Sequence, residues 1–297
     1  MKNFNTIYQE LYKECHDDLE ILRKKAFKET LIAYTITLAI CAMVFAVNVT
    51  IAIILVLTIP SLVIAFSPFY KVYTTQYKNV VMKKLVEFYD SSLSFNPVGK
   101  IKNTSYKDAE FELYDYFYAN DLIFGKIDNE IEFEAGDVRT EIETTDSDGN
   151  TSRSTVFSGL FSSAKFNNDI KSTIKIRSDK GFLGKLLPAN KQLIQLDSQE
   201  FEKLFDVYAT DKIVAMRVLT SDILDYMISF RKENKIKYEL TLKNSSLYIR
   251  IHCKDMFEPP SRKDSLDFDT LYMYYKIIHF ICELNRKFYY IISEKNI

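Results

Sequence analysis

The sequence predicts an α+β domain, with a mixed or antiparallel sheet covered by helices, attached to an N-terminal transmembrane hairpin of two helices. An uncharged apolar run covers residues 30–70, and apolar residues recur at spacings of three and four on both sides of it. Beyond these, strand-like and helix-like segments alternate. We therefore expect an amphipathic stalk helix at 1–29, the transmembrane hairpin at 30–70, a second stalk helix and linker at 71–99, and a cytoplasmic α+β domain at 100–297.

The apolar run contains 41 residues without a charge, from Thr30 to Tyr70. One helical span of a bilayer needs about 20 residues, so the run predicts two spans joined by a tight turn. Asn48 lies near the midpoint, and asparagine accepts turn conformations that its β-branched neighbours resist. A buried hairpin in the core of a soluble protein is the alternative to this interpretation.

Basic residues on both sides of the run predict the orientation. Four precede the first span and four follow the second: Arg23, Lys24, Lys25, Lys28, Lys71, Lys78, Lys83 and Lys84. Positive flanks stay in the cytoplasm. We expect a multi-pass protein of the cytoplasmic membrane with both termini in the cytoplasm and Asn48 on the opposite side.

The stalk helices are predicted from two apolar stripes at helical spacing. They comprise Phe4, Tyr8, Leu11, Cys15, Leu19 and Leu22 before the spans, and Tyr73, Tyr77, Val81, Leu85 and Phe88 after them. Residues 90–100 contain Pro97, Gly99 and several other turn formers, so the second helix should end there.

The remaining segments are assigned by period and turn signals. Helices are expected at 106–121, at 221–233 with Ser221 as the cap, and at 269–292. Hairpins are expected at 122–144, turning at Asp128-Asn129, and at 238–253, turning at 243–246. Single strands are expected at 154–166, 172–178, 191–197 and 212–220.

No catalytic or metal-binding constellation stands out. Four cysteines without a CxxC pair are typical of reduced cytosolic thiols. His252, Cys253, His279 and Cys282 could ligate zinc, but neighbours on a strand point to opposite faces, so we expect no zinc and no other cofactor.

Other binding signals are equally weak. Residues 146–150 lack the glycine and glutamate positions of a calcium loop, and residues 180–185 lack the spacing of a phosphate loop. The many Tyr and Phe residues fall mostly on core-facing positions, so we expect no nucleic-acid binding.

The segment 180–191 is the one candidate contact surface. Lysines alternate there with apolar residues between two predicted strands: Lys180, Phe182, Leu183, Lys185, Leu186 and Leu187. Such a loop either packs on its own domain or contacts the membrane or a partner.

Several blocks of sequence resemble a bacterial family named domain of unknown function 3137. They are 119–134, 155–167, 197–220, 247–251 and 274–285, of which the block Phe157, Gly159, Leu160, Phe161, Phe166 and Asn167 is the most specific. The resemblance extends over residues 85–290. It implies an N-terminal membrane anchor, a cytoplasmic domain of uncharacterised activity and a LemA-like membrane protein as partner, and it supplies no catalytic residue.

The sequence therefore favours an integral membrane protein whose cytoplasmic domain binds a partner protein or ligand. The bilayer is the expected lipid partner. A membrane-anchored enzyme with an unrecognised site and a lipid-contacting domain are the alternatives.

Overall fold

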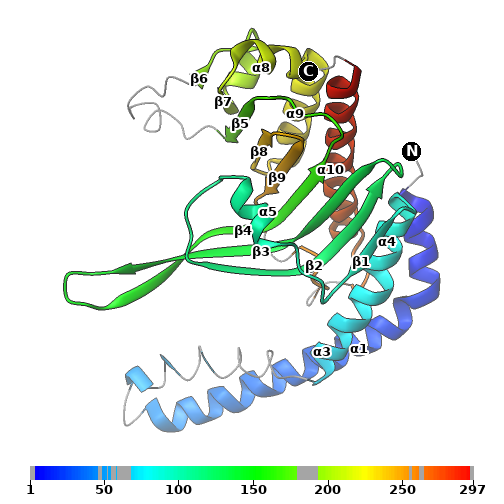
Figure 1. The fold of residues 1–297 in the computed structure, drawn as a ribbon. Coiled ribbons are helices and arrows are strands. Elements are labelled where there is room, and N and C mark those ends of the chain that lie inside the picture. Colours follow the sequence, from blue (N-terminus) through cyan, green and yellow to red (C-terminus); the bar gives the residue numbers. More distant parts are fainter. Residues whose placement is uncertain are drawn as a thin grey trace. The chain divides into compact units, whose positions relative to one another are not determined.

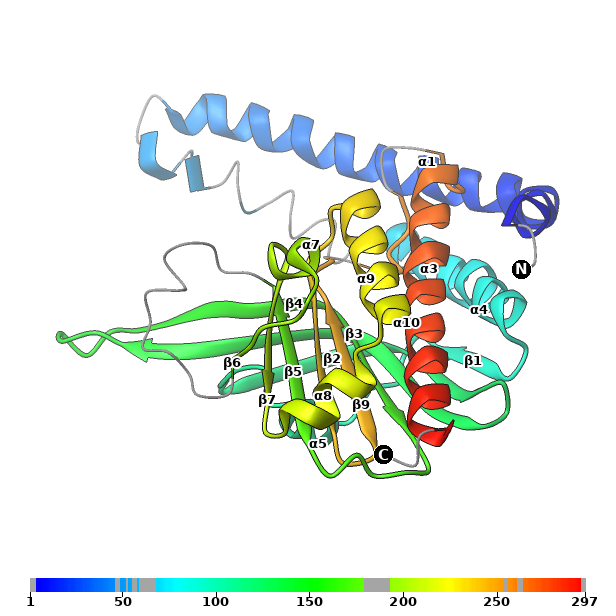
Figure 2. The same ribbon diagram turned by 90° about the horizontal axis from the view of Figure 1, so that it is seen from above.

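The computed structural model divides into two compact units (Figures 1 and 2). One, called the helical unit, comprises Met1–Phe88 and Phe257–Tyr275. The other, called the sheet unit, comprises Tyr89–Met256 and Lys276–Ile297. The structure describes residues 4–45, 49–51, 53–54, 58, 68–178, 193–253, 256–260 and 264–294.

The helical unit contains the predicted amphipathic helices. They are α1 (Phe4–Phe45), α3 (Pro68–Tyr77), the π-helical turn η1 (Lys78–Met82) and α4 (Lys83–Tyr89). The apolar stripe of the N-terminal half of α1 is buried at Phe4, Leu11 and Leu19. Tyr73 and Tyr77 are also buried, so helical spacing has placed both stripes against a core.

The second half of α1 enters the uncharged run without a break and ends at Phe45. Among the described residues, no helix combines the length and the apolarity required to span a membrane. Asn48 lies outside the described residues, so its role at a transmembrane turn stays a prediction.

The sheet unit confirms the α+β class. Its described strands form one nine-stranded sheet in the order β1-β2-β3-β4-β9-β8-β5-β7-β6, and each pairing in it is antiparallel. The strands are β1 (Leu93–Asn96), β2 (Tyr116–Ile127), β3 (Ile131–Thr145), β4 (Thr151–Lys165), β5 (Thr173–Ser178), β6 (Leu193–Ile194), β7 (Phe205–Ala209), β8 (Tyr238–Lys243) and β9 (Ser246–Ile251). Leu93–Asn96 thus joins the sheet by pairing with β2, and the predicted boundary at residue 100 stays a prediction.

Helices cover both faces of the sheet. They are α5 (Asn103–Asp108), α7 (Gln199–Glu202), α8 (Lys212–Val218), α9 (Ser221–Asn234) and α10 (Phe268–Glu294). Phe230 of α9 and Phe280 of α10 stack with ring centroids 3.7 Å apart and contact Tyr238 of β8. Side chains alternate along a strand, so Glu239 faces the opposite side, where α5 and residues 109–115 lie.

Two hairpins follow their predicted turns. Asp128 and Asn129 have φ angles of 53° and 62°, the positive values that the central residues of a type I′ turn take. Asn244 has φ 54° between β8 and β9. Both turns confirm the sequence assignment.

The predicted helix at 106–121 is wrong. The helix α5 ends at Asp108, and Glu110 takes a left-handed φ of 51° that redirects the chain. The backbone N–H of Asp115 then donates to the carbonyl of Glu141, which begins the pairing of β2 with β3. The aromatic residues of this segment reach the core from a loop and a strand.

The predicted strand at 212–220 is also wrong, because residues 212–218 form α8. The Asp211 carboxylate accepts hydrogen bonds from the backbone N–H groups of Ile213 and Val214 at 2.8 and 3.1 Å. Such an N-cap outweighs the strand preference of the β-branched residues that follow. In the segment 191–197, only Leu193–Ile194 are described as strand.

The β3–β4 hairpin projects from the sheet (Figure 1). The last pair of β2 with β3 is Tyr116 with Glu141, whereas β9 pairs with β4 from Leu160 onward. Residues 143–156 are exposed. We call this part, residues 142–156, the hairpin arm.

Candidate functional site

The predicted contact residues of the 180–191 segment are Lys180, Phe182, Leu183, Lys185, Leu186 and Leu187, and all of them lie outside the described residues. Their contact with a membrane or partner stays a prediction. The candidate site therefore comes from residues that sequence reasoning did not single out. It lies in the sheet unit, where residues 109–115 cross β4, β5, β8 and β9.

A buried ion cluster forms the base of this site. Arg250 of β9 pairs across the sheet with Glu239 of β8, and their side chains meet at 2.5 Å. Residues 109–115 add Glu112, which forms a second ion pair with Arg250. Tyr106 donates a hydrogen bond to Glu112 at 2.6 Å and Thr140 donates another at 3.2 Å. One guanidinium thus joins two carboxylates that are both largely shielded from water.

Phe111 packs against two cations of this face. Its ring lies 4.5 Å from the Arg250 guanidinium and 4.7 Å from that of Arg177 on β5. Arg177 donates to the carbonyl of Leu240 at 2.5 Å and to the hydroxyl of Thr241 at 2.9 Å. Burial lowers the pKa of both guanidinium groups, yet arginine keeps its charge at any physiological pH. The aromatic ring and the hydrogen bonds replace part of the lost hydration.

Glu110 links residues 109–115 to the sheet through ion pairs. Its carboxylate bonds Lys175 of β5 at 2.7 Å and Lys243 of β8 at 2.5 Å. The hydrogen bonds from Lys175 and Lys243 lower the pKa of Glu110 to about 2. The sheet presents four cations here, and residues 109–115 supply two carboxylates that form ion pairs with three of them, Lys175, Lys243 and Arg250.

A hollow of about 410 Å³ lies against this cluster. Its lining residues are Lys107, Glu110, Glu112, Leu113 and Tyr114. Leu113 is 86% exposed, although the neighbouring Glu112 side chain is fixed by the ion cluster. A rigid base beside an exposed apolar side chain is suited to binding, because the protein loses little conformational entropy when a partner associates. The described residues that line it include no nucleophile paired with a base.

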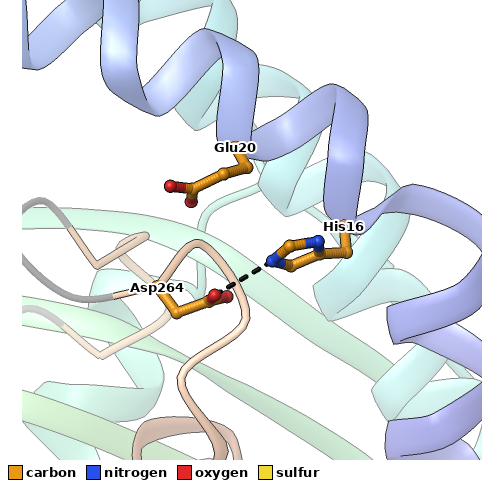
Figure 3. Close-up of side chains that lie close together, drawn as sticks. All are labelled: His16, Glu20 and Asp264. Carbon is orange, nitrogen blue, oxygen red and sulfur yellow. Dashed lines mark hydrogen bonds and ion pairs between the residues drawn. The ribbon is translucent and has the colours of Figure 1, made fainter.

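A second cluster lies in the helical unit (Figure 3). His16 and Glu20 of α1 meet Asp264, whose carboxylate is 2.9 Å from the Nε2 atom of His16. The other ring nitrogen of His16 is 3.0 Å from Asp17. The Ser265 backbone N–H donates to Glu20 at 3.1 Å. These contacts fasten α1 to the segment that precedes α10.

His16, Glu20 and Asp264 offer ligand atoms within 4.8 Å of one another, as a metal site would require. Glu20, however, already accepts hydrogen bonds from Arg23 at 2.8 and 2.5 Å. The Arg23 hydrogen bond is the main reason that the pKa of Glu20 falls to about 2. A guanidinium beside the carboxylate disfavours a further cation. The residues therefore fit a hydrogen-bonded contact between α1 and the segment that precedes α10 better than a metal site.

The zinc-capable residues are dispersed across the sheet unit. His252 contacts the Phe157 ring, and burial lowers the pKa of His252 to about 4. His279 faces the hydroxyl of Tyr89 at 3.3 Å, and burial raises the pKa of Cys253 to about 12. Cys282 is fully buried on α10. In the described part of the chain these four residues are not part of any three-residue ligand group.

The sequence did carry one signal for the ion cluster. Glu239 and Arg250 interrupt strands that are otherwise buried along their length. Charged residues in continuously buried strands are expected to be paired. Their partner Glu112 could not be inferred, because it lies in the segment predicted as a helix.

The comparisons with known proteins yield little about function. No curated protein matches the sequence. Among solved structures, the crystal structure of the mycobacterial trehalose monomycolate transport factor A, TtfA, is similar with a TM-score of 0.33 and 9% identity, over 70% of this chain and 96% of that chain. A likeness of this size carries no argument about function. The model of the family DUF3137, "Protein of unknown function", matches residues 155–289, and over that part of the chain the resemblance predicted from the sequence is confirmed.

Proposed function

We propose that this chain is a membrane-anchored binding protein, inserted through its apolar run and using its sheet unit to hold a partner. The observation that carries the proposal is a change in exposure along α1. The N-terminal half buries its apolar stripe, whereas Leu31, Ile36 and Leu38 are 53%, 54% and 58% exposed. The described residues at 49–54 continue this pattern, since Val49, Ile51, Ile53 and Ile54 are also exposed.

Such a row of apolar side chains is unfavourable in water. Contiguous exposed apolar surface of this kind is typical of contact with a membrane or another protein. Lysine and arginine flank the run on both sides and none lies within it. Insertion in the cytoplasmic membrane as a hairpin, with both termini in the cytoplasm, satisfies both features.

Membrane extraction tests the anchor. The full chain should remain in the membrane pellet after washing with alkaline carbonate. Replacing Leu31, Ile36 and Leu38 with Lys should release it, because a lysine near the centre of a span, as at Ile36 and Leu38, costs about 2.5–3.5 kcal/mol. Ile21→Lys is the matched control, since Ile21 is 52% exposed on the same helix but precedes the run.

Topology is tested by labelling single cysteines in a cysteine-free background. An impermeant reagent added outside the cell should label Asn48→Cys but not Lys25→Cys or Thr75→Cys. Labelling of position 75 from outside would contradict the hairpin. Release of the Ile21→Lys variant would show that α1 exposes its apolar residues to a protein partner instead.

The partner is proposed to bind at the hollow beside Leu113. This side chain is 86% exposed, and the charged residues Lys107 and Glu110 line the same hollow. A LemA-like membrane protein is the partner that the family resemblance suggests. The segment 180–187 stays a candidate for additional membrane contact.

Photocrosslinking in cells tests this surface. A benzophenone amino acid at position 113 should give a discrete crosslinked band that mass spectrometry can identify. Val98 is the matched control, because it is also apolar, in the sheet unit and 82% exposed, but does not line the hollow. Equal crosslinking at both positions would contradict a specific site.

A further inference from the structure

A second hollow in the sheet unit combines an apolar floor with an acidic rim. It has a volume of about 290 Å³ and lies between residues 196–198 and the helices α8 and α9. Its lining residues are Leu196, Asp197, Ser198, Met216, Leu219, Ser221, Leu224 and Asp225. It shares no lining residue with the hollow beside Leu113.

The floor of this hollow is made by leucines from three segments. Leu196, Leu219 and Leu224 are 8%, 5% and 7% exposed, so their positions are fixed by the surrounding core. Met216 is 45% exposed, and its flexible thioether can adapt to what it contacts. Such a floor favours an alkyl chain over a polar group.

The rim is acidic, and none of the described residues that line it is basic. Asp197 and Asp225 are exposed lining residues, and neither side-chain carboxylate has a hydrogen bond or ion pair with another residue in the described part of the chain. Neighbouring carboxylates are committed: Glu200 pairs with Lys232, and Glu202 accepts a hydrogen bond from the Leu196 N–H at 2.8 Å. Asp222 pairs with Lys287 at 2.5 Å. The two carboxylates at the hollow are therefore available to a ligand.

We propose that this hollow binds an alkylammonium group, with the ammonium between Asp197 and Asp225 and the alkyl chain on the leucine floor. An anion would be repelled by both carboxylates, and a neutral alkyl group would leave them without a partner. The group can belong to a free amine or to the lysine side chain of another protein. This site does not depend on the membrane anchor or on the partner proposed for Leu113.

Calorimetric titration of the purified full chain tests the proposal. Hexylammonium should bind with one site per chain. Hexanol and hexanoate should bind at least tenfold more weakly, because they lack the charge that the rim recognises. Butylammonium should bind about 16-fold more weakly than hexylammonium, since it lacks two methylene groups and each buried methylene contributes about a fourfold change in affinity.

Charge-removing variants locate the site. Asp197→Asn combined with Asp225→Asn should lower hexylammonium affinity at least tenfold while leaving hexanol binding unchanged. Glu233→Gln is the matched control, because Glu233 is exposed on α9 but does not line the hollow. Unfolding temperatures of the variants should match the parent, since the replaced carboxylates are exposed and unpaired.

A comparison of hexylammonium with Nα-acetyl-lysine methylamide distinguishes a free amine from a protein lysine as the natural ligand. Comparable affinity identifies a protein lysine as the natural group, whereas much weaker binding of the lysine derivative identifies a free amine. Equal binding of hexanol and hexylammonium would overturn the proposal. So would hexylammonium affinity that survives the double Asn substitution or falls equally in Glu233→Gln.

Discussion

Arg250 is the residue on which the base of the candidate site depends. Its side chain is 10% exposed and joins Glu239 and Glu112, whose side chains are 9% and 15% exposed. Removing the water from three charged groups is costly, and only their mutual contacts and hydrogen bonds offset this cost. The cluster therefore contributes more to a unique arrangement of residues 109–115 than to net stability.

Arg250→Ala should lower the free energy of unfolding by about 3–5 kcal/mol, because it leaves two buried carboxylates without their cation. Urea denaturation of the full chain, followed by circular dichroism, measures the change. The triple variant Arg250→Met, Glu239→Leu and Glu112→Leu should lose much less, since it removes the charges together.

An exposed arginine provides the control. Arg153→Ala also removes a guanidinium from a carboxylate, Glu143, but on the solvent-exposed hairpin arm. It should barely change the unfolding midpoint. A midpoint shift as large as that of Arg250→Ala would contradict the role assigned to burial.

The stability that the His16 contacts give to the packing of α1 should depend on pH. Partial burial lowers the pKa of His16, but the hydrogen bonds to Asp264 and Asp17 outweigh it and raise the pKa above its ordinary value of 6.5. A raised folded-state pKa means that the stabilisation is fully present below pH 6.5 and is lost as the pH rises through the folded-state value.

The measurement compares wild type with His16→Gln across pH 5.5 to 8.5. The difference in unfolding midpoint should be largest at the acidic end and should shrink as the pH rises. Asp264→Asn should abolish most of this dependence. A difference that grows with pH would contradict the assignment.

At the scale of elements, strands flanked by clear turns could be predicted from the sequence. Segments whose secondary structure depends on one residue, such as Glu110 or Asp211, could not. The β2–β3 and β8–β9 hairpins combine alternation with a turn that tolerates positive φ. In 106–121 the aromatic spacing reflects real burial, since Phe111, Tyr114 and Phe117 all contact Tyr106. The three rings converge because the left-handed φ at Glu110 reverses the chain. The spacing of apolar residues in the sequence gives no sign of such a turn.

The hairpin arm should open independently of the rest of the sheet. An isolated pair of strands has little stability of its own. Its turn is held by Asp146, whose carboxylate accepts from the backbone N–H groups of Asp148 and Asn150 at 3.0 and 2.9 Å. Asp146→Ala should accelerate hydrogen exchange at residues 142–155 and leave exchange in β8 and β9 unchanged, as measured by mass spectrometry.

The contradicting outcome is equally simple to observe. If exchange in β8 and β9 accelerates as well, the arm is part of the cooperative core. Asp169→Ala serves as the control, because its carboxylate also accepts from a backbone N–H two residues later, at Lys171, but outside the arm.

At the scale of the whole molecule, the position of the first strand decides which fragment folds. Leu93–Asn96 pairs with β2, and Arg286 bonds Asp90 and the hydroxyl of Tyr89. A fragment of residues 89–297 should therefore unfold cooperatively at a higher urea concentration than one of residues 100–297. Equal midpoints would show that residues 89–99 are dispensable.

The resemblance to a family could be inferred from the sequence, because it depends on contiguous residues. The membrane anchor stays a prediction. The candidate site could not be inferred. Glu112, Glu239 and Arg250 come from three separate segments, and no spacing rule links them. The same holds for the hollow at Asp197 and Asp225, which requires the helix α8 in place of the predicted strand.

The helical unit is assembled from two segments far apart in the chain, Met1–Phe88 and Phe257–Tyr275, and this sets an order on its formation during translation. Phe4 packs on the rings of Phe268, Tyr272 and Tyr275, with centroids 5.1 to 5.3 Å away. A ribosome adds about 5–20 residues each second, so Phe4 waits on the order of 10–50 s for these partners. By the end of that interval every described strand of the sheet has been synthesised, while the Phe4 ring still lacks its partners on α10. A nascent chain should accordingly engage a chaperone or the insertion machinery at its N-terminus first.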